Sequence, residues 1–235
     1  MDLIWQGFAD AIRLLFHGDP ATFRIAGLSL IVSGSATLFA ALVGVPLGSL
    51  LALRQFPGHA LLTSLVNTGM GLPPVVVGLG VSILLWRSGP FGALALLYTP
   101  AAMIIAQFIV AMPLAAGLAR AAVSLLDPDI IEALRVDGAG EWRILWEVLQ
   151  AARAQVLVVV AAAFGRAISE VGASLMVGGN ILNSTRILTT AITLETSKGD
   201  FARAIALGLL LLLLAFAVNV GLLRGAQNLP GRALS

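Results

Sequence analysis

Five long apolar stretches limit what this chain can fold into more than any other feature of its sequence. They cover residues 25–53, 61–86, 91–118, 154–178 and 204–223. A helix needs roughly 20 apolar residues to cross the hydrocarbon core of a bilayer, and each stretch is long enough. Since 59% of the 235 residues are hydrophobic and only 11% are charged, too few charged side chains remain to cover a water-soluble domain. The sequence therefore predicts an all-α, polytopic membrane protein with about five transmembrane helices.

The segments around these stretches indicate how the chain is organised. Residues 3–16 carry apolar side chains near one side of a helix but are too few to cross, which predicts a helix in the membrane interface. We expect residues 1–24 to form this helix and the lead into the first span, residues 25–223 to form the membrane domain with a loop at 119–153, and residues 224–235 to form a tail. The loops on the two sides carry nearly equal numbers of Lys and Arg, so the positive-inside rule does not orient the chain.

The polar composition excludes several kinds of site. The chain has no cysteine and only two histidines, so it offers little from which to build a metal or haem centre, and we expect no metal and no cofactor. Its 14 Lys and Arg residues nearly balance 12 Asp and Glu residues without a basic cluster, which argues against nucleic-acid binding. No phosphate-binding Gly-x-x-x-x-Gly-Lys-Ser/Thr loop occurs, so we do not expect this chain to hydrolyse ATP.

The loop at residues 119–153 holds much of the charge, with six acidic and four basic residues. Asp127-Pro128 combines an N-cap residue with proline at the first helical position, which predicts the start of a helix. Gly138 can take the left-handed conformation that ends this helix, and residues 141–150 are suited to a second one. The loop therefore predicts two helices outside the bilayer core. A solvated connector without a partner is the alternative.

The spacing within this loop carries a resemblance. Glu132-Ala133-Leu134 is followed by Gly138 and, after nine further residues, by Val148. This pattern resembles the EAA loop of ABC importer permeases, although Leu134 replaces the second Ala and Gln150-Ala151 stands where that family has Leu-Pro. The helix before the glycine is the part that, in this family, docks on an ATP-hydrolysing subunit.

Further motifs, spread over nearly the whole chain, resemble the molybdate, sulfate and tungstate branch of that family. They are GLPPVVVG at residues 71–78, RSGP at 87–90 and FGRAISEVGA at 164–173. The motifs ISEVG at 168–172, TTAI at 189–192 and ETSKGDF at 195–201 look most like tungstate-type permeases.

The resemblance implies a type I importer permease in a bacterial or archaeal plasma (inner) membrane, in contact with membrane lipid. It implies a homodimer with the path between the two copies, two ATP-binding subunits on the cytoplasmic side, and an extracytoplasmic oxyanion-binding protein. Because EAA loops face the cytoplasm, the N-terminus is expected outside and the C-terminus inside. The residues expected to couple to the ATPase are Ile130, Ile131, Glu132, Ala133, Leu134, Arg135 and Gly138. Ile130, Ile131 and Leu134 would offer it an apolar contact.

Two features of the spans are candidates for the translocation pathway or its gate. Arg166 and Glu170 are four residues apart, so each can neutralise the other, whereas an unpaired charge at mid-span would cost about 3 kcal/mol. Pro73 and Pro74 free backbone groups and bend the second span, which is tolerated where the helix faces protein or a water-lined cavity. The alternatives are a pair that only holds helices together and a static kink.

The polar segment between residues 178 and 203 supplies further candidates. Asn180, Thr189 and Thr190 carry amide and hydroxyl donors suited to a weakly held oxyanion, although an ordinary capped loop is the alternative. Ser197 and Asp200 are placed to cap the last span. Gly44 and Gly48 in the first span predict close packing of two helices rather than a functional site.

These observations favour a permease subunit of an ATP-driven importer that carries an oxyanion, tungstate in the first place and molybdate or sulfate as alternatives. An ion-coupled secondary carrier is a rival, but it would need an inverted repeat and more intramembrane acids. An intramembrane enzyme would need a catalytic constellation that the spans lack, and a scaffold without a transport role is the last alternative.

Overall fold

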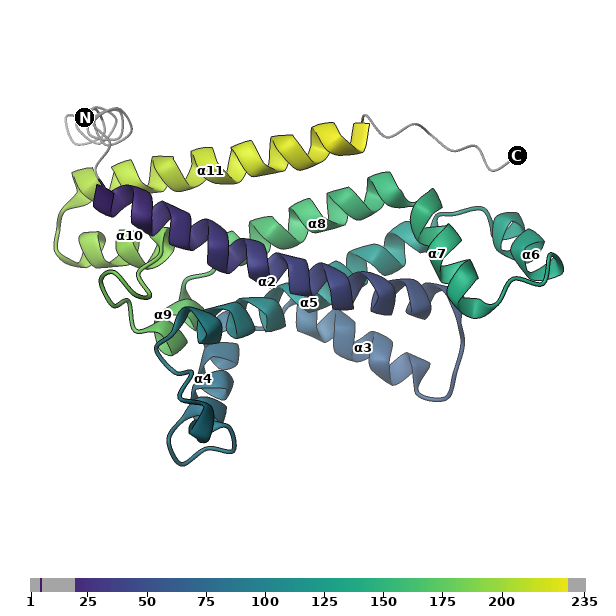
Figure 1. The fold of residues 1–235 in the computed structure, drawn as a ribbon, viewed down its shortest axis with the longest axis horizontal. Helices are drawn as coiled ribbons and strands as arrows, with labels where there is room; N and C mark the ends of the chain where they lie inside the picture. Colours follow the sequence, from purple (N-terminus) through teal and green to yellow (C-terminus); the bar gives the residue numbers. More distant parts are fainter. Residues whose placement is uncertain (1–4, 6–19, 228–235) are drawn as a thin grey trace.

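The computed structural model describes Trp5 and residues 20–227, and the elements found there are helices with no β-strand among them (Figure 1). In chain order these are α2 Pro20–Leu53, α3 His59–Met70, α4 Pro74–Leu85, η1 Gly92–Leu94, α5 Pro100–Ser124, α6 Pro128–Val136, α7 Glu141–Ala151, α8 Arg153–Ile168, α9 Gly172–Gly178, α10 Leu188–Ser197 and α11 Phe201–Gln227. The predicted interfacial helix, apart from Trp5, and residues 228–235 of the tail lie outside the described residues. The all-α class is confirmed.

Three described helices are long and apolar enough to cross a membrane unbroken, namely α2, α5 and α11. Two pairs of helices pass the same test only when they are taken together. The pair α3 and α4 is bent by 106°, and the pair α7 and α8 is bent by 78°. The described residues therefore contain three spans, or up to five if each bent pair counts as one. Five, the predicted number, is the upper limit of this range.

The second predicted span, residues 61–86, is divided in the structure. Helix α3 ends at Met70, and the Gly71 backbone N–H closes its last turn by donating to the Thr68 carbonyl at 3.1 Å. Pro73 and Pro74 follow, and neither has an N–H with which to continue the helix. Pro74 instead occupies the first position of α4. The predicted bend is therefore a break between two helices.

The third and fourth predicted spans also differ from the observed helices. Helix α5 begins at Pro100 rather than residue 91, because the Thr99 side chain caps it by accepting from the Ala102 N–H at 3.4 Å. The stretch 154–178 is divided into α8 and α9. At the start of α11, Asp200 Oδ1 accepts from the Arg203 N–H at 3.1 Å, so the cap predicted at Asp200 is confirmed. Ser197 does not take part in it, because its hydroxyl donates to the Thr193 carbonyl of α10 at 2.8 Å.

The closest packing in the core joins α2 and α5 at two glycines of α2. A Cβ added to Gly44 would lie 2.8 Å from the Met112 carbonyl oxygen. One added to Gly48 would overlap the Ala116 carbonyl and lie 2.9 Å from the Arg120 nitrogen. The two backbones can approach this closely only because neither glycine has a side chain. The predicted close packing at these glycines is confirmed.

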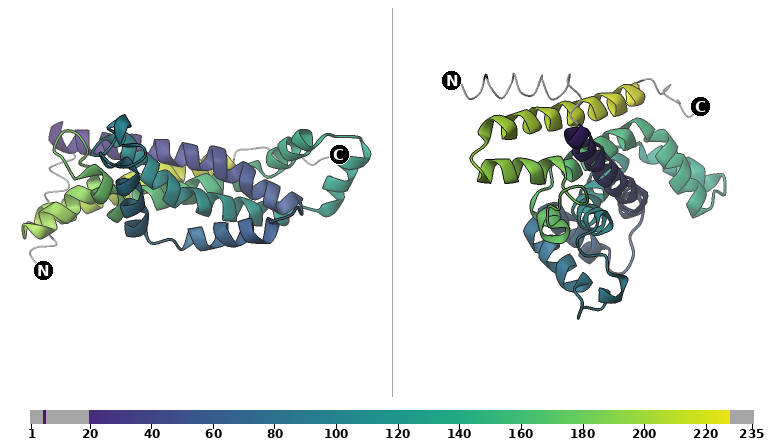
Figure 2. Two further views of the ribbon diagram at one scale, coloured as in Figure 1. Left: turned by 90° about the horizontal axis from the view of Figure 1, so that it is seen from below. Right: turned by 60° about the vertical axis from the view of Figure 1, so that its left-hand side comes forward.

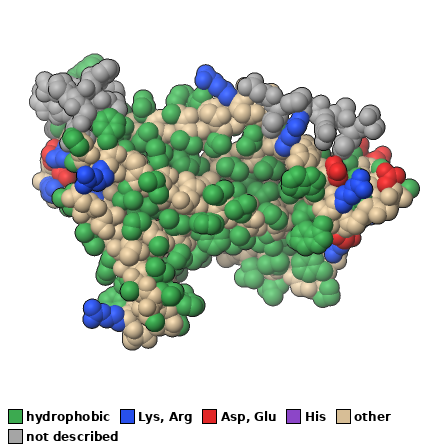
Figure 3. All heavy atoms as spheres, viewed as in Figure 1, with side chains coloured by type: hydrophobic (Ala, Val, Ile, Leu, Met, Phe, Trp, Pro, Cys, Tyr) green, Lys and Arg blue, Asp and Glu red, His purple; other side chains and the backbone are tan. Residues whose placement is uncertain are grey.

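The arrangement of the helices separates the functional regions. Helices α2, α5, α8 and α11 follow the long axis, with α6 and α7 at one end and α9 and α10 at the other, while α3 and α4 diverge from their side (Figures 1 and 2). On the face drawn in Figure 3, Asp and Glu side chains lie at the two ends, and apolar side chains cover much of the surface between them. This distribution suits a chain whose middle lies in lipid and whose ends meet water.

Candidate functional site

The segment between α5 and α8 folds into the two helices that the sequence predicts. Asp127 Oδ1 accepts a hydrogen bond from the Asp129 N–H at 3.0 Å, and Pro128 opens α6. Gly138 then takes a φ of 73°, a left-handed conformation that a residue with Cβ adopts only under strain. Helix α7 starts three residues later at Glu141. The predicted cap and turn are confirmed.

The orientation of α6 differs from the expectation for its aliphatic side chains. Ile131 and Leu134 pack against a buried cluster formed by Val123 of α5 with Ile144 and Val148 of α7. These two side chains therefore do not form an outward apolar contact together with Ile130, as the sequence suggested. The physical reason is that a helix of nine residues is unstable alone and needs its apolar face to attach it to the rest of the chain.

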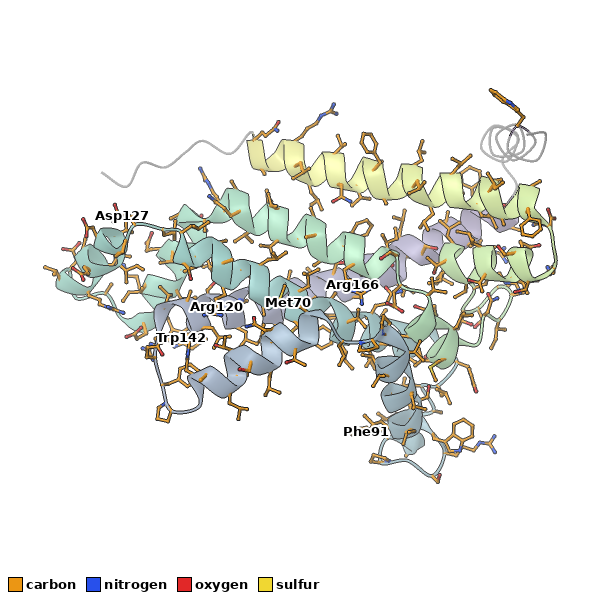
Figure 4. All side chains as sticks on the ribbon, turned by 180° about the vertical axis from the view of Figure 1, so that it is seen from behind. Met70, Phe91, Arg120, Asp127, Trp142 and Arg166 are labelled. Atoms are coloured by element: carbon orange, nitrogen blue, oxygen red, sulfur yellow. The ribbon has the colours of Figure 1, made fainter. Side chains whose placement is uncertain are left out.

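The outward surface of this segment has a different composition. Glu132, Ala133 and Arg135 are exposed on α6, next to Val136, which is 87% exposed. Trp142 on α7 is 81% exposed and lies at the same end of the molecule as Asp127 (Figure 4). Val136 and Trp142, exposed outside the predicted spans, are therefore candidates for contact with a partner protein. The sequence reasoning missed Val136 and Trp142, although a tryptophan between two charged residues outside the spans was a usable signal.

An ion pair attaches residues 127–151, called the coupling segment after the role predicted for them, to the end of α2. Arg54, directly after α2, meets Glu141 at the start of α7 through two contacts, Nη2 to Oε1 at 2.6 Å and Nε to Oε2 at 3.0 Å. Both side chains are roughly half exposed, so the pair adds modestly to stability. Its bidentate geometry joins the start of α7 to the end of α2.

The second candidate site is the break between α8 and α9. Helix α8 ends at Ile168, so Glu170 lies in the break rather than on the continuous helical face that its spacing from Arg166 suggests. Its carboxylate is buried, accepts from the Ala173 N–H at 3.0 Å and pairs with the Arg166 guanidinium at 3.5 Å. Its carbonyl oxygen accepts from the Thr189 hydroxyl of α10 at 3.0 Å. Glu170 therefore joins three helices.

The two breaks meet in space. Position 172, at the start of α9, packs on Val75 of α4, since a Cβ added to Gly172 would lie 2.9 Å from a Val75 methyl group. A Cβ added to Gly78 of α4 would lie 2.8 Å from the Ala173 Cα. Met70, just before the first break, and Arg166, just before the second, both lie near the middle of the molecule (Figure 4). The structure thus brings the Pro73-Pro74 break and the Glu170 break side by side.

The polar candidates after α9 are bonded within the chain. The Thr190 hydroxyl is fully buried and helps to cap α10, since it accepts from the Ile187 N–H at 3.1 Å and donates to the Ile187 carbonyl at 3.0 Å. Asn180, with a left-handed φ of 51°, donates to the Thr190 carbonyl at 3.2 Å and accepts from Arg186 Nε at 3.2 Å. With Thr189 bonded to Glu170, these side chains form a scaffold around the second break. Nowhere in Trp5 and residues 20–227 do three or more His, Asp or Glu side chains gather as a metal site would require.

The comparisons with known proteins decide the family. The model of one family, described as the binding-protein-dependent transport system inner membrane component, matches residues 44–223, which include both the coupling segment and the two breaks. The chain belongs to this family of ABC importer permeases. Membership implies a binding protein and an ATPase as partners and confirms the identification made from the EAA-type spacing. It also means that this permease is a transport subunit in the inner membrane rather than an enzyme.

Individual relatives agree with this identification. The permease is 42% identical to the tungstate uptake system permease protein TupB of Peptoclostridium acidaminophilum. The 219 aligned residues cover 93% of this chain and 96% of the relative. The permease is 29% identical over 217 residues to the molybdenum transport system permease protein ModB of Escherichia coli, which covers 87% and 95%. A solved structure, the inward-facing MetNI methionine ABC transporter, has a TM-score of 0.71 at 20% identity and covers 88% of this chain and 95% of that chain, so it supports the fold alone.

Proposed function

We propose that this permease, paired with a second copy of itself, forms the path by which a tetrahedral oxyanion crosses the inner membrane, with tungstate as the first candidate. The observation that carries the proposal is the order of identity, 42% to a tungstate permease and 29% to a molybdenum permease, each over most of both chains. Molybdate, which has the same charge and shape, is the second candidate, and sulfate is the third.

In this proposal the ATPase docks on the outward surface of the coupling segment. Glu132, Ala133 and Arg135 offer polar and small side chains there, and Trp142 offers a large apolar contact. Ile130, Ile131, Leu134 and Gly138 complete the set, with the last three holding and turning the helix. A displacement of α6 would pass through the packed cluster to α5 and α7, and through the bidentate ion pair to α2. The segment is then cytoplasmic, with the C-terminus inside and the N-terminus outside.

The two adjoining breaks are the proposed gate. Broken helices of transporters mark permeation paths, because their freed backbone groups must face protein or a water-filled cavity. Pro73 and Pro74 would form one side of the gate, and Arg166 and Glu170 the other. Asn180, Thr189 and Thr190 support the second side, since their hydrogen bonds hold α10 against it. Opening would require Glu170 to exchange its partners, and this exchange would switch the gate between two states.

A second copy is the proposed occupant of the apolar surface on the divergent helices. Leu61 and Leu65 of α3 and Val75, Val76 and Leu79 of α4 are all at least half exposed. One chain with three to five spans is also too small to enclose a polar path, and a two-fold partner supplies the missing wall. In the full chain, oxidation of Leu65→Cys or of Leu79→Cys, each made alone, should give a covalent dimer. If both variants remain monomeric after oxidation, the proposed pairing is refuted.

The transport proposal is tested on the assembled complex of permease, ATPase and binding protein. We expect ATP hydrolysis in proteoliposomes to rise with tungstate, less with molybdate and least with sulfate. A rise with sulfate alone would replace the substrate assignment, and stimulation by none of the three would reject an oxyanion importer. Uptake on an ion gradient without ATP would indicate a secondary carrier instead.

The orientation is tested by labelling from one side of the membrane. Because the chain has no cysteine, single cysteines at Asp137 in the coupling segment and at Asn183 near the opposite end give unambiguous reporters. In intact cells, a membrane-impermeant maleimide should label the cysteine at position 183 and leave the one at position 137 unlabelled until the membrane is opened. The reverse pattern would invert the proposed topology.

A further inference from the structure

A groove at the junction of α2, α7 and α8 lies outside both the proposed gate and the coupling surface. It has a volume of about 470 Å³ and is lined by Val45, Leu149, Gln150, Arg153, Val156 and Leu157. Four of these side chains are aliphatic, and the two polar ones, Gln150 and Arg153, lie where α7 ends and α8 begins. The groove therefore combines an apolar wall with one cationic end.

The cation of this groove has no anionic partner among the residues that the structure describes. Arg153 Nη2 is buried and makes no hydrogen bond, and no ion pair of Arg153 exists within Trp5 and residues 20–227. By contrast, Arg54 and Arg166 each meet a carboxylate. A buried guanidinium nitrogen without a partner is unfavourable, because the water it gave up has not been replaced. The position of Arg153 thus favours an anion that Trp5 and residues 20–227 do not supply.

The height of Arg153 in the membrane limits which anion this can be. The chain turns by 78° between α7, which belongs to the water-exposed coupling segment, and α8, which continues into the apolar region. Arg153 is the first residue of α8. In the proposed topology, in which α7 is cytoplasmic, a side chain at this turn lies at the depth of lipid headgroups, and the aliphatic side chains of Val156 and Leu157 follow it along α8 toward the bilayer core.

We propose that the groove binds an anionic phospholipid, with its phosphate on Arg153 and Gln150 and part of an acyl chain along Val45, Val156 and Leu157. The guanidinium fork matches the geometry of a phosphate group and can bind it through two hydrogen bonds. A free phosphate or a transported oxyanion would gain nothing from the aliphatic wall, whereas a lipid uses both parts of the groove. The leaflet rests on the proposed topology, which makes it the cytoplasmic one.

Native mass spectrometry of the purified complex of permease and ATPase tests this site directly. Titration with phosphatidylglycerol or with phosphatidylcholine should show a preference for the anionic lipid. Arg153→Gln should weaken phosphatidylglycerol binding by roughly five-fold, the factor that one Lys or Arg near an anionic membrane surface contributes. The matched control is Arg143→Gln, which removes an equal charge from an exposed arginine of α7 and should leave the affinity unchanged. Equal losses in the two variants, or no loss in Arg153→Gln, would overturn the proposal.

Two further arms separate a lipid from a free anion. Val156→Phe narrows the aliphatic wall without touching the guanidinium, so it should also weaken phosphatidylglycerol binding while the complex elutes as before in size exclusion. Millimolar inorganic phosphate or tungstate should not displace the bound lipid. Displacement by either ion, together with full affinity in Val156→Phe, would assign the groove to a free oxyanion and refute the lipid site.

Discussion

Replacement of Gly48 by alanine should destabilise the chain, although alanine is the better helix former. The new Cβ would overlap the Ala116 carbonyl and lie 2.9 Å from the Arg120 nitrogen. These are backbone atoms of α5, so no side-chain rotation can make room and the two helices must separate. Overpacking of a well-packed core costs about 1–3 kcal/mol, and the upper part of that range applies to a rigid obstacle. Subtraction of the roughly 1 kcal/mol that alanine gains over glycine in a helix leaves a net loss of about 1–2 kcal/mol.

The same substitution elsewhere on α2 supplies the control. A Cβ on Gly34 would meet nothing within 4 Å, so Gly34→Ala keeps the gain in helix propensity without the clash. For a chain of this size, 1 kcal/mol corresponds to about 2–4 °C in Tm. We therefore expect the apparent Tm of the purified chain in detergent, followed by the fraction that remains monodisperse after heating, to fall by about 2–8 °C for Gly48→Ala and to stay equal or rise for Gly34→Ala.

The opposite signs make this prediction easy to refute. If Gly48→Ala is as stable as the unmodified chain, α2 and α5 do not approach as closely as the structure indicates. If both variants lose stability equally, the effect reflects glycine in α2 generally rather than the contact with α5. Gly48→Ser is a further check. Because the serine side chain is larger than that of alanine, this variant should lose at least as much stability as Gly48→Ala.

Three further predictions concern coupling and gating. Gly138→Val forces a branched residue into a left-handed turn at a cost of roughly 1 kcal/mol or more. It should uncouple ATP hydrolysis from transport while the amount of permease in the membrane stays normal. The control Gly140→Ser, at a position outside the left-handed region, should leave coupling intact. Glu170→Ala removes a charged acceptor, so it should lower the free energy of unfolding by about 1–3 kcal/mol and abolish uptake. Glu170→Gln keeps an acceptor for the N-terminus of α9 and should lower the Tm less. Equal Tm values for the two variants would contradict the capping role. Arg54→Glu should lower transport-coupled ATPase activity with a stability loss below about 1 kcal/mol, and the swap Arg54→Glu with Glu141→Arg should restore it; a swap no better than the single variant would argue against a direct pair.

The coupling segment shows how far local sequence patterns reach. Asp127-Pro128 predicts the start of α6, and Gly138 predicts its end, because capping and left-handed turns depend on bonds between residues a few positions apart. The direction in which Ile131 and Leu134 face was not predictable in this way. Their partners include side chains of α7, and the docking of α6 on α7 decides which apolar side chains remain for a partner protein.

The gate shows the same limit over a longer range. The proline pair predicts an interruption of the second span, and the spacing of Arg166 and Glu170 predicts their ion pair. The bond between Glu170 and Thr189 joins residues 19 positions apart, and the contact between α4 and α9 joins spans that are separated by the whole of α5 to α8. No periodicity records such contacts, since each depends on how several helices pack at once.

The sequence by itself indicated the membrane environment, the helical class, the family and the positions of α6 and α7. Hydropathy is a sum over neighbouring residues, and the coupling segment's caps and glycine turn are local as well, so both can be read along the chain. Tertiary structure alone decided that two interrupted spans meet beside Glu170, at Gly172 and Ala173, and which side chains of α6 face outward. It also decided that Arg153 lies beside an apolar groove without a partner in the described part of the chain. The physical reason is that burial and pairing of a side chain are set by distant segments, whose positions follow from packing rather than from any local pattern.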